Sequence, residues 1–126
     1  EQALEQFFGD EMVIDVLHLG MGADGHTASL FPGEPALVES SRRVATAQAP
    51  PSAAVRDRLS LTLPVLATAR LCLVAAAGDA KRDAFQRVLD AYDGGDLTDG
   101  PPASRVRPDG PLVWLVDRAV AQGSAD

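Results

Sequence analysis

The chain has 126 residues, of which 46% are hydrophobic, and it carries a formal net charge of −7 at pH 7. This length allows one hydrophobic core and is too short to suggest two domains. The acidic balance argues against a nucleic-acid surface, which needs clustered lysine and arginine. The apolar runs are far shorter than the roughly 20 residues that a membrane span needs. We therefore expect neither nucleic acid nor a membrane as partner.

One cysteine is present, Cys72, and it lies in the apolar run at 71–75. A single cysteine cannot form an internal disulfide, and its apolar neighbours favour a small core residue over a nucleophile. The start of the chain lacks the ordered charged, apolar and small-residue segments of a secretory signal. These features predict a reduced, cytoplasmic protein.

The first half of the chain predicts short elements around a glycine-rich turn. A helix is expected over 3–8, followed by a buried strand over 13–19 and then the turn. A short helix is expected to begin near Thr27 and to end before Pro32. Residues 33–43 are polar and aperiodic and are expected to form a loop. A short strand is expected over Val44–Gln48.

The second half alternates between strand and helix signals. Residues 58–62 alternate with period two, as a half-buried strand does. Leu63-Pro64 is expected to open a helix that runs through Ala69, with the proline in its first turn. The continuous apolar run at 71–77 predicts a central parallel strand. Asp79 is a good N-cap for a helix running to about 92. A helical turn at 103–105, a strand over Leu112–Val116 and a terminal helix capped by Asp117 complete the pattern.

Strands that alternate with helices predict an α/β fold with a largely parallel sheet flanked by helices. In such sheets, ligands bind beyond the carboxyl ends of the strands. We therefore expect Asp24, His26 and Lys81, which follow two of these strands, to lie at the same edge of the sheet.

The glycine-rich turn carries the strongest functional signal. Gly20, Gly22 and Gly25 surround Asp24 and His26. Glycine has no Cβ and lets a ligand approach the backbone, and such turns bind phosphorylated ligands in α/β proteins. A carboxylate can orient an imidazole that accepts a proton. The alternative is that Asp24 caps the next helix and His26 makes an ordinary hydrogen bond.

His18 precedes this turn and could form a metal site with Asp24 and His26. Strand and turn residues at this separation rarely share a ligand sphere, and no cysteine or glutamate completes the set. We therefore expect no metal.

Two cations are candidates for holding an anion. Lys81 is the single lysine and is expected in the first turn of a helix, where free N–H groups and the helix dipole favour an anion. Arg58 begins a predicted strand, and a guanidinium can hold two phosphate oxygens at once. Arg56 competes for the same role. The alternative is that these side chains are solvated surface charges.

The segment Leu-Gly-Met-Gly-Ala-Asp-Gly-His-Thr-Ala-Ser-Leu-Phe-Pro-Gly at 19–33 closely resembles the signature of the 6-phosphogluconolactonases, relatives of the glucosamine-6-phosphate isomerase/deaminases. The similarity covers about 13–118, including Gly-Asp-Ala-Lys at 78–81 and Arg-Leu-Ser-Leu-Thr at 58–62, where Ser60 replaces the usual threonine. The resemblance implies a Rossmann-like fold and lactone hydrolysis without a metal or an organic cofactor. It implies catalysis by His26 with Asp24, and substrate contacts from Gly20, Gly22, Gly25, Arg58 and Lys81.

Two features qualify this interpretation. Where the deaminases carry an acid five residues after the histidine, this chain has Phe31, which favours lactone hydrolysis. The family signature lies near the middle of longer proteins, and this chain begins without methionine. We therefore expect residues 1–126 to be a single partial domain, the C-terminal half, whose partner is the missing N-terminal half. The alternatives are a sugar-phosphate isomerase or deaminase, and an inactive fragment or binding module.

Overall fold

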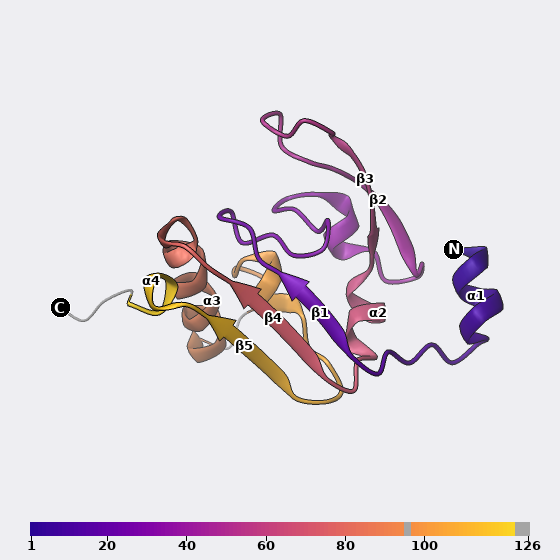
Figure 1. Cartoon of the computed structure of the whole chain (residues 1–126). Helices are drawn as coiled ribbons and strands as arrows, with labels where there is room; N and C mark the ends of the chain where they lie inside the picture. The colour runs from indigo at the N-terminus through magenta and orange to yellow at the C-terminus, as the bar shows by residue number, and fades with distance from the viewer. Residues whose placement is uncertain (95–96, 123–126) are drawn as a thin grey trace.

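The computed structural model describes residues 1–94 and 97–122, and its centre is a parallel sheet of three strands in the order β1-β4-β5 (Figure 1). Its strands are β1 (Leu17–Gly20), β4 (Cys72–Ala76) and β5 (Leu112–Val116). The α/β class is therefore confirmed. β1 is shorter than the expected strand over 13–19, because Ile14 makes only an isolated bridge to Ala69.

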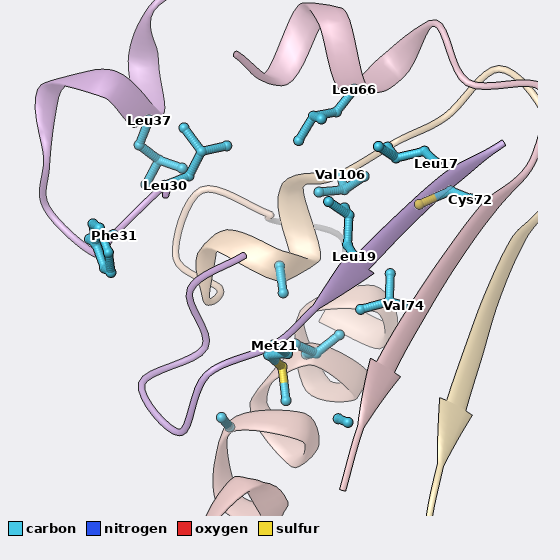
Figure 2. Packing of buried hydrophobic residues seen from close by; sticks show 14 of the residues in the cluster. Leu17, Leu19, Met21, Leu30, Phe31, Leu37, Leu66, Cys72, Val74 and Val106 are labelled. Atoms are coloured by element: carbon cyan, nitrogen blue, oxygen red, sulfur yellow. The ribbon is translucent and has the colours of Figure 1, made fainter. Parts of the chain in front are cut away.

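One face of this sheet packs against the helices and forms the core. Cys72 and Val74 of β4 point to the same side as Leu17 and Leu19 of β1 (Figure 2). The covering elements are α2 (Leu63–Ala67), α3 (Arg82–Gly94), α4 (Arg118–Ala121) and the 3-10 helix η3 (Pro102–Arg105). Cys72 is fully buried, and burial raises the pKa of its thiol. The interpretation of Cys72 as a core residue is confirmed.

The opposite face of the sheet is open within the described part of the chain. Val113 and Leu115 of β5 point to it and are 38% and 51% exposed. In Figure 1, α3 and η3 lie behind the sheet and no helix lies in front of it. Parallel sheets are normally covered on both faces. This sheet therefore presents an apolar surface that its own helices leave uncovered.

A separate hairpin stands beside the sheet. It consists of β2 (Val44–Gln48) and β3 (Asp57–Leu61), paired antiparallel and outside the main sheet. Ala47 and Ala49 of this hairpin belong to the core cluster that contains Leu30 and Phe31. The hairpin therefore packs against the segment that follows the glycine-rich turn.

Three local predictions are wrong. No helix begins at Thr27: Thr27 and Leu30 pair across a tight turn in which Ala28 has a φ of 51°. This turn buries both Thr27 and Leu30, which are 1% and 0% exposed, and that burial outweighs the local helix signal. The expected loop over 33–43 contains the 3-10 helix η1 (Pro35–Val38), which buries two apolar residues, Ala36 and Leu37.

Asp79 does not cap a helix either. The chain after β4 forms the 3-10 helix η2 (Asp79–Lys81), whose N-cap is Gly78 and which has no side-chain cap. Asp117 supplies the missing acceptor: its Oδ2 accepts from the Gly78 amide at 2.9 Å, and its Oδ1 accepts from the Val120 amide at 2.9 Å. The predicted capping of the terminal helix by Asp117 is confirmed.

The remaining elements agree with the sequence. α1 (Gln2–Phe8) ends at Gly9, whose φ is 69°, and η3 matches the expected turn at 103–105. No helix formed by the described residues is long and apolar enough to cross a membrane.

Candidate active site

The glycine-rich turn is anchored at both of its ends. The Thr27 hydroxyl donates to the carbonyl of Gly20 at 2.7 Å, and the carbonyl of Gly25 accepts from the Ala103 amide at 3.0 Å. Gly25 has a φ of 83°, and a Cβ there would lie 2.4 Å from Pro101. Only glycine suits this position, because a side chain would meet both backbone strain and a clash.

Asp24 and His26 form a bonded pair inside this turn. The Oδ1 of Asp24 lies 2.5 Å from Nδ1 of His26 and accepts from the His26 backbone amide at 3.0 Å. Partial burial acts to raise the pKa of Asp24, but these hydrogen bonds outweigh it and hold the pKa below its ordinary value. An ionised carboxylate only accepts, so Nδ1 carries the proton and Nε2 of a neutral ring is an acceptor. The helix-capping alternative fails because no helix follows.

The ring of His26 is held by its neighbours. A Cβ on Gly22 would lie 2.3 Å from both Cε1 and Nδ1 of the ring, so the imidazole occupies the space that a side chain would fill. The ring of Phe31 lies on it at a centroid distance of 4.6 Å. The His26 side chain is still 32% exposed. A small molecule therefore has access to a histidine whose orientation is fixed.

His26 opens into a first depression, which we call the arginine-side depression. It has a cavity volume of about 520 Å³ and lies between the turn and the β2–β3 hairpin. Asp24, Ser29 and Phe31 line it from one side and Arg58 from the other. The structure thus brings Asp24, His26 and Arg58 together. Arg56 is instead tied to the hairpin, where its Nε donates to the carbonyl of Ala49 at 3.3 Å.

A second depression, which we call the lysine-side depression, also borders His26. It has a cavity volume of about 470 Å³ and is lined by His18, Leu19, Gly20, Met21, Gly22, His26, Ala28 and Lys81. His18, Leu19 and Gly20 lie in β1 itself, whereas the other lining residues follow the carboxyl ends of β1 and β4. His26 and Lys81 therefore share one depression at this edge of the sheet. His26 and Ala28 line both depressions.

Comparison with known proteins identifies the family. A family model described as glucosamine-6-phosphate isomerases/6-phosphogluconolactonase matches residues 1–114. The chain belongs to this family. It is 40% identical to the 6-phosphogluconolactonases of Rattus norvegicus and Homo sapiens over 94% of its own length, but over only 44% and 45% of theirs.

Solved structures of the family agree. The 6-phosphogluconolactonase of Trypanosoma brucei superposes with a TM-score of 0.75 at 31% identity, covering 90% of this chain and 43% of that one. That of Leishmania guyanensis gives a TM-score of 0.76 at 29% identity, covering 90% and 43%. The chain thus spans about half the length of the relatives that it matches.

A metal site at His18 was an alternative at the sequence level. Among residues 1–94 and 97–122, no group of three or more histidine, cysteine, aspartate or glutamate side chains lies close enough to hold a metal ion. His18 and His26 border the same depression, and among the described residues the side chain of Asp24 bonds to His26 and not to His18.

Several residues that shape the site were not predicted from the sequence. Pro101 packs on Gly25 and Ser60 binds the backbone of Ser29, and each contact joins distant parts of the chain. Phe31 and Ser60 stood out only as departures from the family pattern. These differences from the usual family residues drew attention to the two positions, but they did not predict which parts of the chain the side chains contact.

Proposed function

We propose that this chain is the C-terminal half of a 6-phosphogluconolactonase, which hydrolyses 6-phospho-D-glucono-1,5-lactone to 6-phosphogluconate. One observation carries the proposal: the Asp24–His26 pair, with an acceptor nitrogen free at Nε2, opens into a depression lined by Arg58. The 40% identity to curated 6-phosphogluconolactonases supports the choice of substrate class. Because of its single cysteine, Cys72, we infer a reduced, cytoplasmic setting.

Proton transfer through His26 accounts for the chemistry. Its Nε2 accepts a proton from water as the water oxygen attacks the lactone carbonyl carbon. The tetrahedral intermediate then expels the ring oxygen, which takes the proton back from the imidazolium, and the product is the open-chain acid. Asp24 holds the ring in the required tautomer and stabilises the imidazolium. No residue in this sequence of steps requires a metal or an organic cofactor.

The two cations provide binding energy at a distance from the reacting carbonyl. Arg58 and Lys81 line two separate depressions that both border His26, and each is a candidate for holding the 6-phosphate. Binding a remote group fixes the carbonyl against the base, so that binding energy lowers the barrier to reaction. Of the three glycines in the turn, Gly22 leaves room for the His26 ring and Gly25 for Pro101, so Gly20 is the one whose missing side chain lets the sugar ring approach the backbone.

Phe31 distinguishes this proposal from the deaminase alternative. It lies five residues after His26, and its ring contacts the imidazole ring at a tilt of 41°. A phenyl ring cannot supply the proton that ring opening of an amino sugar requires. The position therefore supports hydrolysis over deamination.

The open face of the sheet supports a missing partner. β1 is an edge strand and the face bearing Val113 and Leu115 is uncovered within the described residues. A parallel sheet of this family is expected to be covered on both faces. We propose that the N-terminal half of the domain covers this face, and that the chain needs it for full activity.

The test joins this chain to the part of the rat relative that it does not match; we call the product the joined protein. We expect the joined protein to hydrolyse the phosphorylated lactone faster than the spontaneous background, and the chain alone to be much slower. A folded joined protein with no excess hydrolysis contradicts the proposed activity. Equal activity of the chain alone contradicts the need for a second half.

A further inference from the structure

Ser60 connects the two walls of the arginine-side depression, because it lies on the hairpin and bonds to Ser29 of the opposite wall. It lies on β3 and is only 4% exposed. Its hydroxyl oxygen accepts from the backbone amide of Ser29 at 3.1 Å and donates to the carbonyl of Leu61 at 2.9 Å. A buried hydroxyl with both roles satisfied has one fixed orientation.

The bond from Ser29 reaches the tip of the turn that follows His26. Ala28 and Ser29 form this tip, and Ala28 is held at a φ of 51°, where a residue other than glycine is strained. The base of the turn is held by Thr27, whose hydroxyl bonds to Gly20. The tip is held by Ser60. The segment after His26 is thus fixed at one end to the sheet and at the other to the hairpin.

The same strand carries Arg58 two residues earlier. Side chains two apart on a strand point to the same face, and both Ser29 and Arg58 line the depression that contains His26. The hairpin belongs to a separate two-stranded sheet, so no ladder of the main sheet sets its position. Within the described chain, the Ser29–Ser60 bond is the one hydrogen bond between 20–31 and 44–61. The other contacts there are apolar and non-directional.

We propose that Ser60 is a positioning residue: its hydroxyl sets the spacing between the loop that holds His26 and the strand that carries Arg58. This inference rests on the proposed function for its kinetic consequence. The hydroxyl does not touch substrate. It fixes how far the guanidinium stands from the base, and therefore whether a phosphate held by Arg58 places the carbonyl at Nε2 of His26.

Three variants separate this role from a general loss of stability. Ser60→Ala removes the acceptor for the Ser29 amide. Ser60→Thr keeps a hydroxyl, and threonine is the usual residue of the resembled family strand. Thr62→Val is the matched control, because Thr62 is fully buried near the end of the same strand and its hydroxyl bonds only to the backbone at Arg42 and Arg43, away from the turn.

The kinetic readout is the preference of the joined protein for the phosphorylated lactone over plain gluconolactone, measured as a ratio of kcat/KM values. We expect Ser60→Ala to lower this ratio about 10-fold. The loss should not exceed that in Arg58→Ala, because Ser60→Ala misplaces the guanidinium but does not remove it. Ser60→Thr should keep it. Thr62→Val should keep it even where its Tm falls as far as that of Ser60→Ala. An unchanged ratio in Ser60→Ala, or an equal loss in Thr62→Val, overturns the proposal.

A second readout does not depend on the lactonase activity. Amide exchange at Ser29, and the NMR signals of the His26 ring and the Arg58 guanidinium, can be followed in this chain itself. Ser60→Ala should speed exchange at Ser29 at least 10-fold and shift both side-chain signals, whereas Thr62→Val should do neither. If the joined protein proves inactive while these changes appear, the proposed function fails and the positioning role stands. If exchange at Ser29 is unchanged, the positioning role fails by itself.

Discussion

The two depressions beside His26 differ in how much of each this chain builds. The arginine-side depression is enclosed by the glycine-rich turn and by the β2–β3 hairpin, so both of its walls belong to the described residues. The lysine-side depression lies on β1, an edge strand, and takes in His18 and Lys81 near the uncovered face of the sheet. One side is bounded by this chain, and the other faces the region where more protein is expected.

The proposed site therefore has two parts: one needs only this chain, and the other also needs the second half of the domain. The Asp24–His26 pair and Arg58 need only contacts within this chain, such as the 2.5 Å bond between the pair. Lys81 ends a short 3-10 helix, and its depression gains a second wall only if another half covers the sheet. We therefore expect Arg58 to bind an anion in the chain alone and Lys81 to contribute mainly in the joined protein.

The largest effect is expected at His26, which borders the same depression as His18 but differs from it in having a carboxylate partner. His26→Ala in the joined protein should lower kcat by about 10²–10⁴-fold with little change in KM, because a positioned base contributes that much. His18→Ala is the matched control, since His18 lacks a carboxylate partner among the described residues, and it should retain most of kcat. The lactone hydrolyses spontaneously, so that background must be subtracted. Comparable losses of kcat in both variants would contradict the proposal that the Asp24–His26 pair provides the general base.

Removing Arg58 or Lys81 tests whether each depression contributes to binding the phosphate. Arg58→Ala and Lys81→Ala should each lower kcat/KM for the phosphorylated lactone by about 10- to 150-fold, since a charge-assisted hydrogen bond contributes roughly 1.5–3 kcal/mol. Activity on plain gluconolactone should be unchanged. Equal losses on both substrates would mean that these side chains support the fold instead.

The same two variants test the asymmetry of the site in the chain alone. Binding of 6-phosphogluconate, followed by NMR, should weaken in Arg58→Ala and change little in Lys81→Ala. In the joined protein, both variants should weaken it. A chain that depends equally on both cations when alone would show that the lysine-side depression is complete without a second half.

Local signals explain what the sequence predicted well. β5 coincides with the expected strand over Leu112–Val116, and Asp117 caps the helix after it, because both depend on neighbouring residues. The Asp24–His26 pair is equally local, since one glycine separates the two residues. Buried apolar runs are therefore readable from a single sequence. Caps are readable only in part, because Asp117 caps its helix and Asp79 does not.

Long-range contacts explain what the sequence could not predict. The bond of Ser29 to Ser60 and the packing of Pro101 on Gly25 join segments with no shared periodicity. The expected helix near Thr27 is replaced by a turn because burial of Thr27 and Leu30 depends on the hairpin and the core around them. Tertiary packing determines these contacts and the turn after His26, whereas local helix propensity alone predicts a helix near Thr27 that does not form.

Two glycines of the same turn give the next prediction. Gly22→Ala would place a methyl group 2.3 Å from the His26 ring, so the ring must move, whereas Gly20→Ala would meet only the Ala75 carbonyl at 3.9 Å. A displaced base commonly loses about 10- to 100-fold in rate. We expect that loss in kcat for Gly22→Ala. Gly20→Ala leaves the His26 ring in place, so kcat should stay near normal, and any loss of the proposed contact of Gly20 with the sugar ring should appear in KM. A Gly22→Ala protein with normal kcat would show that the ring position observed here is not the reactive one.

The smallest effect concerns stability in acid. The pKa of Asp24 lies below its ordinary value of 3.8 in the folded chain, so its ionised form stabilises the fold above that pH. This contribution is lost as the pH falls through the lowered, folded-state pKa. The pair is partly solvated, with side chains 32% and 39% exposed, so the effect is screened.

Asp24→Asn keeps an oxygen acceptor but removes the charge. The difference in unfolding free energy between wild type and Asp24→Asn, measured with urea from pH 7 downwards, should be largest near neutrality and should shrink below about pH 3.8. Repeating the comparison in a His26→Ala background isolates the part that depends on the ring, in a double-mutant cycle. The pH-dependent difference should become smaller there, because only the backbone amide of residue 26 still donates to Asp24. A difference that persists undiminished in the His26→Ala background would mean that the backbone amide alone stabilises the carboxylate, and that Asp24 and the imidazole are not coupled as the hydrolysis mechanism requires.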